Sequence, residues 1–209
     1  MKTTVNRLTA TFLVGGLLLT GIAVAAAGWP GSTDITNWYG GPAYLGKPEL
    51  ALTAAFVRAG GGPGHFSIQK ALVAMLGKKT VNAELAKLTT QYGKHRVTDF
   101  IDGMNYAVAD GLKRATAAGV RLPPAPGNLT GAALAKAMVR AGTAPGGTFW
   151  AGELFDHLLS HGIHNQVMAD ADKARSGAFD RNLHRLTNQA LFDVAHALGM
   201  NGVKLASLH

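Results

Sequence analysis

Cysteine is missing from the 209-residue sequence. Without it the chain cannot form disulfide bonds, which are the usual support of small exported domains. A thiolate metal site and a cysteine nucleophile are excluded for the same reason. The fold must therefore be stabilised mainly by side-chain packing.

The sequence also lacks an uninterrupted hydrophobic run of about 20 residues, the length that a membrane-spanning helix needs. Its first apolar stretch, residues 12–24, is short and is broken by three glycines. Lys2 and Arg7 precede this stretch, and small residues at 23–27 offer a cleavage site. This order predicts a cleaved signal peptide over residues 1–27, with an uncleaved anchor as the alternative. We expect a periplasmic or secreted protein with no stable membrane span after cleavage.

Acidic residues are scarce as well. Asp and Glu number 12 against 20 Lys and Arg, which gives a formal net charge of +8. Loss of residues 1–27 would remove Lys2 and Arg7 and leave 18 basic residues. This excess favours contact with anionic surfaces, such as those of a cell envelope. A nucleic-acid-binding protein concentrates its basic residues on one face or tail, whereas these are scattered, so we expect no nucleic-acid partner.

The alternation typical of β-strands is nearly absent, whereas alanine and helical spacing are abundant from residue 48 onward. Most of the expected helices end at a glycine, the residue that adopts the left-handed conformation of a helix end most easily. The expected helices span about residues 48–59, 68–76, 83–92, 95–118, 130–141, 149–161, 166–174 and 179–198. The sequence therefore predicts an all-α fold of about eight helices.

Two segments of the chain resemble one another. ALTAAFVRAGGGPG at 51–64 and ALAKAMVRAGTAPG at 133–146 have nine identical residues out of fourteen. Four helices are expected in the same order in each half, and such recurrence marks a duplicated unit. We therefore predict two tandem homologous four-helix repeats, residues 48–120 and 129–199, with pseudo-two-fold packing in one domain or two closely packed ones.

Three further segments lie outside these repeats. Residues 28–47 are rich in glycine, proline and aromatic residues and lack periodicity, so we expect a lead-in that covers the core. A lid or a docking arm is the alternative for this segment. Residues 121–128, RLPPAPGN, form a linker because proline interrupts a helix. Residues 200–209 are the C-terminal tail.

Arg58 and Arg140 occupy matching positions in the last turns of two expected helices. A cation at this place interacts favourably with the negative end of the helix dipole. We interpret both arginines as residues that stabilise helix ends. A pair of symmetric anion sites is the alternative.

The second repeat contains three histidines, at 157, 161 and 164, that have no histidine counterpart in the first repeat. Glu153, His157 and His161 are four residues apart, which would place them on one face of a helix. Neutral imidazole is a common metal ligand, so this spacing predicts a zinc, copper or haem site. The candidate ligands are His157, His161, His164, Glu153, His184 and His196.

A structural interpretation of the same residues stays open. His161 directly precedes Gly162, where an imidazole can bind the last carbonyl groups of an ending helix. Asn165 would then begin the next helix. Glu153 and His157 would form part of a solvated face.

Motifs of known enzyme classes are absent. The sequence has neither the HExxH pattern of zinc peptidases nor the Gly-x-Ser-x-Gly turn of serine hydrolases. We therefore expect an exported helical binding protein, with its ligand in the second repeat or in the groove between the repeats. The alternative is a ligand-free structural or protein-interaction module of the cell envelope. An enzyme that uses carboxylates and histidines between helices is the weakest hypothesis.

Overall fold

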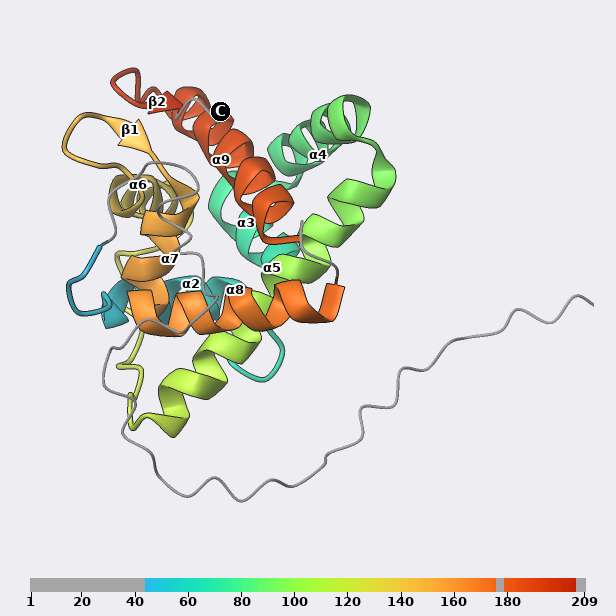
Figure 1. Ribbon diagram of the computed structural model, residues 1–209. Helices are drawn as coiled ribbons and strands as arrows, with labels where there is room; N and C mark the ends of the chain where they lie inside the picture. Colours follow the sequence, from blue (N-terminus) through green and yellow to red (C-terminus); the bar gives the residue numbers. More distant parts are fainter. Residues whose placement is uncertain (1–43, 176–178, 206–209) are drawn as a thin grey trace, which may run out of the picture. The chain divides into compact units, whose positions relative to one another are not determined.

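Figure 1 shows a computed structural model, which describes residues 44–175 and 179–205. Within these ranges the side chains of residues 172, 174, 175 and 179–187 lie outside the description. All described residues belong to one unit of the chain, residues 32–209. The predicted signal peptide, residues 28–43 of the predicted lead-in and residues 206–209 lie outside the described residues.

The described part of the chain is mostly helical, which confirms the all-α prediction. It has eight helices and two very short strands, β1 and β2. The helices are α2 Leu50–Ala59, α3 Ile68–Leu76, α4 Lys78–Tyr92, α5 Lys94–Ala117, α6 Gly131–Ala141, α7 Ala151–Leu159, α8 His161–Arg175 and α9 Phe179–Ala197. None of these helices is long and apolar enough to cross a membrane.

The two strands were not predicted. β1 (Thr148–Phe149) and β2 (Lys204–Leu205) pair in parallel, with Thr148 opposite Lys204. The amide of Lys204 also donates to the carbonyl of Gly147 at 2.8 Å. This pairing attaches the residues after α9 to the loop before α7. It arises between segments far apart in the sequence, so local spacing could not indicate it.

Three helix boundaries differ from the prediction: α4 begins at Lys78 rather than near residue 83, and two boundaries in the second half have moved. α7 ends before Ser160, whose backbone has a φ of 84° and a ψ of 148°. Gly77 occupies the corresponding place between α3 and α4, with a φ of 80° and a ψ of 150°. The predicted helix end at Gly162 and helix start at Asn165 are wrong, because α8 begins at His161 and contains both residues. A serine has adopted the backbone conformation that favours glycine, and the sequence did not reveal this.

Two asparagines bind the first amides of α3 and α7. The Oδ1 atom of Asn105 accepts from the amide of Ile68 at 2.7 Å, and that of Asn188 accepts from the amide of Ala151 at 2.6 Å. The first amides of a helix have no partner within the helix, so each asparagine satisfies one of them. These bonds fix α3 against α5 and α7 against α9.

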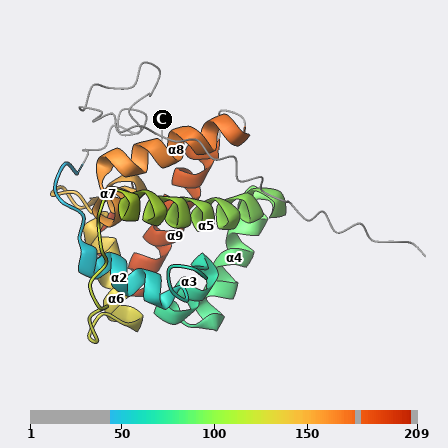
Figure 2. The same cartoon turned by 90° about the horizontal axis from the view of Figure 1, so that it is seen from below.

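The core is shared between the two predicted repeats. α3 packs against α6, α2 against α7, and α5 against both α8 and α9. In Figure 2, α5 runs between α8 on one side and α2 and α3 on the other. The largest fully buried side chains include Phe56, Phe149 and Phe155, and all three belong to one apolar cluster.

Arg58 lies in the last turn of α2, as predicted, and has a further role. Its guanidinium donates to the carbonyls of Ala125, Pro126 and Leu129 at 3.0, 2.9 and 3.2 Å. These carbonyls belong to the proline-rich linker and to the residues that follow it. The arginine therefore ties the linker to the end of α2, rather than only stabilising its own helix end.

Candidate functional site

At the junction of α7 and α8, two of the predicted metal ligands, His161 and His164, lie beside the carboxylate of Asp156. Asp156 was not among the predicted ligands. Asp156 is fully buried, with 0% of its surface exposed. Its two carboxylate oxygens lie 2.9 Å from Nδ1 of His161 and 2.7 Å from Nδ1 of His164. His164 is itself buried, at 1% exposure, against the ring of Phe155. Asp156 thus provides hydrogen-bond partners for one buried and one partly buried imidazole.

Both ring nitrogens of His161 have polar neighbours. Its Nδ1 faces the Asp156 carboxylate, which only accepts, so Nδ1 carries a hydrogen. Its Nε2 lies 2.9 Å from the side-chain nitrogen of Asn165, whose oxygen is buried without a partner among the described residues. Rotation of this amide would direct its oxygen at Nε2 and match a doubly protonated imidazole. Asn165 can therefore present either its nitrogen or its oxygen to Nε2 of His161.

Glu153 lies inside the protein, not on the predicted solvated face. It is 9% exposed, and its Oε2 is buried without a hydrogen-bond partner among the described residues. Burial, and then the negative charge of Asp156, raise the pKa of Glu153 above its usual value. The interpretation of His161 as a residue that ends its own helix is also wrong, since His161 is the first residue of α8.

His157 belongs to a separate contact. Ser160 ends α7 between His157 and His161, so the two do not share a face of one helix. The Nδ1 atom of His157 lies 2.7 Å from Oε1 of Glu49, and Tyr44 stacks on its ring at 3.5 Å between centroids. The amide of Glu49 donates to the carbonyl of His157 at 2.7 Å. His157 thus fastens the residues before α2 onto α7.

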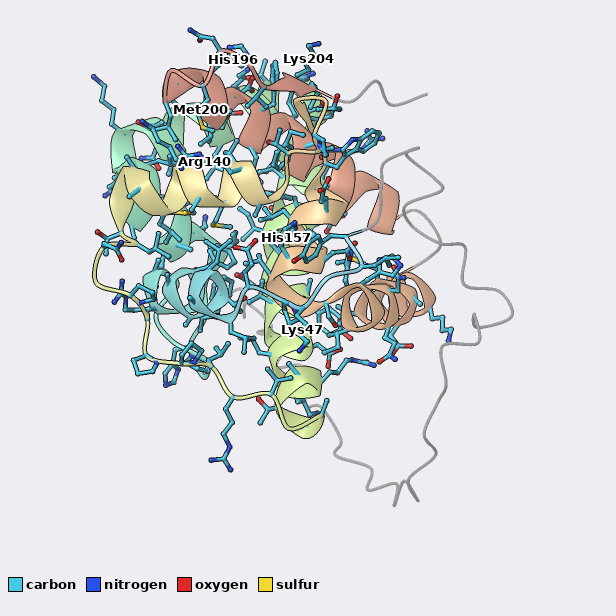
Figure 3. The ribbon with its side chains drawn as sticks, turned by 90° about the vertical axis from the view of Figure 1, so that its left-hand side faces the viewer. Lys47, Arg140, His157, His196, Met200 and Lys204 are labelled. Carbon is cyan, nitrogen blue, oxygen red and sulfur yellow. The ribbon has the colours of Figure 1, made fainter. Side chains whose placement is uncertain are left out.

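The two remaining candidates lie in α9. The side chain of His184 is outside the described residues. His196 is in the last turn of α9, where its ring contacts Phe192 at 4.5 Å between centroids. Figure 3 shows His196 at a distance from His157. The described side chains of histidine, aspartate and glutamate form no group of three or more that could hold a metal ion.

A second candidate site is an apolar cavity between the helices. It has a volume of about 40 Å³ and is lined by residues of α2, α3, α4, α5, α6, α7 and α9, hence of both predicted repeats. Three methionines, Met75, Met104 and Met138, are among the lining residues. No motif in the sequence indicated this cavity, because seven helices contribute to it.

Among the described residues that line the cavity, Glu84 of α4 is the one acidic residue. Burial, followed by a hydrogen bond to Asp193 of α9, raises the pKa of Glu84 to about 7. Its Oε1 is buried and has no hydrogen-bond partner among the described residues. Asp193 is also paired with Lys87 of α4 and accepts from Gln189 at 3.1 Å. Although burial acts in the opposite direction, these hydrogen bonds lower the pKa of Asp193.

Comparison of the chain with protein-family models, with curated proteins and with solved structures gives no match. The function has therefore to be inferred from the geometry of the chain itself.

Proposed function

We propose that the protein is an exported binding protein that takes up a small apolar molecule in the cavity between its two halves. The cavity itself carries the proposal, because its wall is built jointly by helices of residues 50–117 and 131–197. Small-molecule sites are typically concave, mostly apolar and placed between packed elements. The expected signal peptide supports export to the periplasm or secretion.

The size of the cavity limits the ligand. A volume of about 40 Å³ exceeds what one water needs, about 10–15 Å³, and is smaller than the cavity of about 150 Å³ that holds benzene. Methionine has three rotatable bonds and fills irregular spaces adaptably. A ligand of a few heavy atoms fits the cavity as it is, and a larger one requires rotation of Met75, Met104 or Met138.

We further propose that the two halves are homologous repeats with pseudo-two-fold packing. Matching local contacts support this. The amide of Ser67 donates to the carbonyl of Gly60 at 2.9 Å, and that of Trp150 to the carbonyl of Gly142 at 2.7 Å. A methyl group at either glycine would clash with the following phenylalanine, Phe66 or Phe149. A ligand between such repeats would lie near their symmetry axis.

Nuclear magnetic resonance of protein labelled at its methionine methyl groups tests the cavity, with xenon and benzene as probes. We expect the methyl signals of Met75, Met104 and Met138 to shift on addition of either probe, because these groups line the cavity. Met168 and Met200 do not line it and serve as internal controls. Equal shifts of all five signals, or none at all, would contradict the proposal.

A cavity-filling variant, Ala190→Leu, provides the matched control. Ala190 lines the cavity and is buried, so the larger side chain occupies the space that the probe would take. We expect this variant to keep its fold and to lose the shifts. Retention of the shifts in the folded variant would place the probe elsewhere.

The second candidate is the predicted metal or haem site. One observation favours this site. A carboxylate oxygen lies within hydrogen-bond distance of the Nδ1 atom in each of His157, His161 and His164. Histidines that bind a metal usually form such a bond through the ring nitrogen that does not face the metal. Uptake of zinc, copper or haem by protein without a His-tag, and its loss in the double variant His157→Ala/His161→Ala, would support this function. A parent that binds none of them would exclude it and leave the ligand-free envelope module as the alternative to the cavity.

A further inference from the structure

The charges of the described residues are distributed unevenly over the elements. The stretch 111–152 contains no aspartate or glutamate, and neither does the stretch after Asp193. α6, β1 and β2 therefore carry no carboxylate side chain at all. The described acidic side chains of α4, α5, α8 and α9 are Glu84, Asp99, Asp102, Asp110, Asp170 and Asp193.

The other three described carboxylates do not offset a positive charge on α6, β1 and β2. Glu153 and Asp156 are buried residues of α7, and Glu49, whose side chain is 49% exposed, is bonded to His157 and is the one described carboxylate accessible near Lys47. The side with few accessible carboxylates thus comprises α6, the β1–β2 pair and the residues that lead into α2. We refer to this side as the basic face.

Four cations define the basic face: Lys47, Lys136, Arg140 and Lys204. Figure 3 looks onto this side and shows Lys47 before α2, Arg140 on α6 and Lys204 at β2. Lys136 precedes Arg140 by four residues on α6 and therefore lies on the same side of that helix. None of the four forms an ion pair with a described residue; on α4 and α5, Lys87 and Arg114 are paired, whereas Lys78, Lys79 and Lys94 form no ion pair with a described residue either.

The most exposed large hydrophobic side chain of the described residues lies beside one of these cations. Leu45 is 80% exposed and is two residues from Lys47. Its position is fixed by its neighbours, since Tyr44 stacks on His157 and Glu49 is bonded to the same residue. This arrangement places an apolar side chain beside a lysine that forms no ion pair with a described residue, and segments that contact the interface of a bilayer combine these two residue types.

We propose that the basic face docks on an anionic phospholipid bilayer, with the cations at the headgroups and Leu45 inserted between them. Charge complementarity identifies the occupant, because anionic headgroups attract unpaired lysine and arginine side chains. The exposed leucine favours a lipid surface over an acidic protein. This docking is independent of the cavity, since none of these five residues lines it.

Co-sedimentation of the mature protein, purified after export, tests the docking. The probes are vesicles of equal parts phosphatidylglycerol and phosphatidylcholine, and vesicles of phosphatidylcholine alone. Each basic residue near an anionic surface increases binding about fivefold, so Lys136→Glu/Arg140→Glu/Lys204→Glu should reduce binding to the anionic vesicles at least about a hundredfold. Leu45→Ser should reduce it severalfold, and binding should weaken at high salt.

The matched control is Lys78→Glu/Lys79→Glu/Lys94→Glu. It changes the net charge by the same amount, but its three exposed lysines are on α4 and α5. We expect this variant to keep most of the binding. Equal losses in the two triple variants would show that net charge alone is responsible and would overturn the proposal. Equal binding of the parent to both vesicle types, or to neither, would also overturn it.

Discussion

At the scale of single residues, the carboxylate of Asp156 joins α7 to α8. It is fully buried and bonded to two imidazoles, one of them also buried. Removal of one partner from a buried ionic group is costly because it leaves the other without compensation. Two of the predicted histidines, His161 and His164, thus lie at this site, whereas His157 lies elsewhere, and Asp156 is the residue that holds the two together.

Asp156→Asn tests this dependence. We expect the free energy of unfolding in urea to fall by about 3 kcal/mol, because the buried imidazole of His164 and the partly buried one of His161 lose their charged acceptor. Asp170→Asn is the control: Asp170 is a half-exposed carboxylate on α8 that pairs with Arg114, and such surface pairs contribute about 0–1 kcal/mol. Equal losses in the two variants would argue against the central role of Asp156.

At the scale of elements, the boundary between α7 and α8 decides which side chains meet. Ser160 adopts a positive φ, a conformation that costs a residue other than glycine about 1–3 kcal/mol. This turn ends α7 and starts α8 at His161, so that Asp156 faces the first turns of the next helix. The packing of α7 and α8 on either side of Ser160 must offset this backbone strain.

A reciprocal exchange tests the strain. Ser160→Gly should raise the free energy of unfolding by about 1 kcal/mol, and Gly77→Ser, at the matching turn of the first half, should lower it by about the same amount. Ser160→Ala, which removes the hydroxyl but keeps the strain, separates the backbone effect from the weak bond of the hydroxyl to the amide of Ile163. A loss of stability in Ser160→Gly would mean that the hydroxyl matters more than the backbone.

At the scale of the whole described unit, the two halves are joined by a shared core and by a polar contact next to the cavity. In that contact Glu84 of α4 binds Asp193 of α9. Because Glu84 has a raised pKa of about 7, the folded chain holds its proton more tightly than the unfolded chain. Its contribution to stability is therefore present at low pH and is lost as pH rises from about 4.5 to about 7.

Thermal unfolding of the parent and of Glu84→Gln at pH 5 and pH 8 measures this contribution. We expect the melting temperature of the parent to fall relative to that of the variant between these values, because glutamine does not ionise and can still donate to Asp193. Asp102→Asn, at an exposed position on α5, controls for the loss of a carboxylate. Parallel pH profiles for the parent and Glu84→Gln would contradict a protonated Glu84 in the folded protein.

Composition and spacing determined the helical class and most helix boundaries. Alanine content, apolar periodicity and glycines at helix ends act within a few residues, and α5 and α6 match their predicted ranges to within one residue. The same local signals failed at Ser160, where a serine adopts the conformation of a glycine, and at β1 and β2, which pair across more than 50 residues.

Only the tertiary structure decided which polar groups meet. The burial of Glu153 and Asp156, the contact between His157 and Glu49, and the cavity beside Glu84 each depend on how separate helices pack. The free energy of each of these features depends on the loss of hydration and on contacts with residues distant in the sequence. Neither can be deduced from the order of residue types along the chain. The spacing of the histidines therefore indicated a segment rich in polar side chains, whereas the partners of these side chains followed from the packing of α7 on α8 and on the residues before α2.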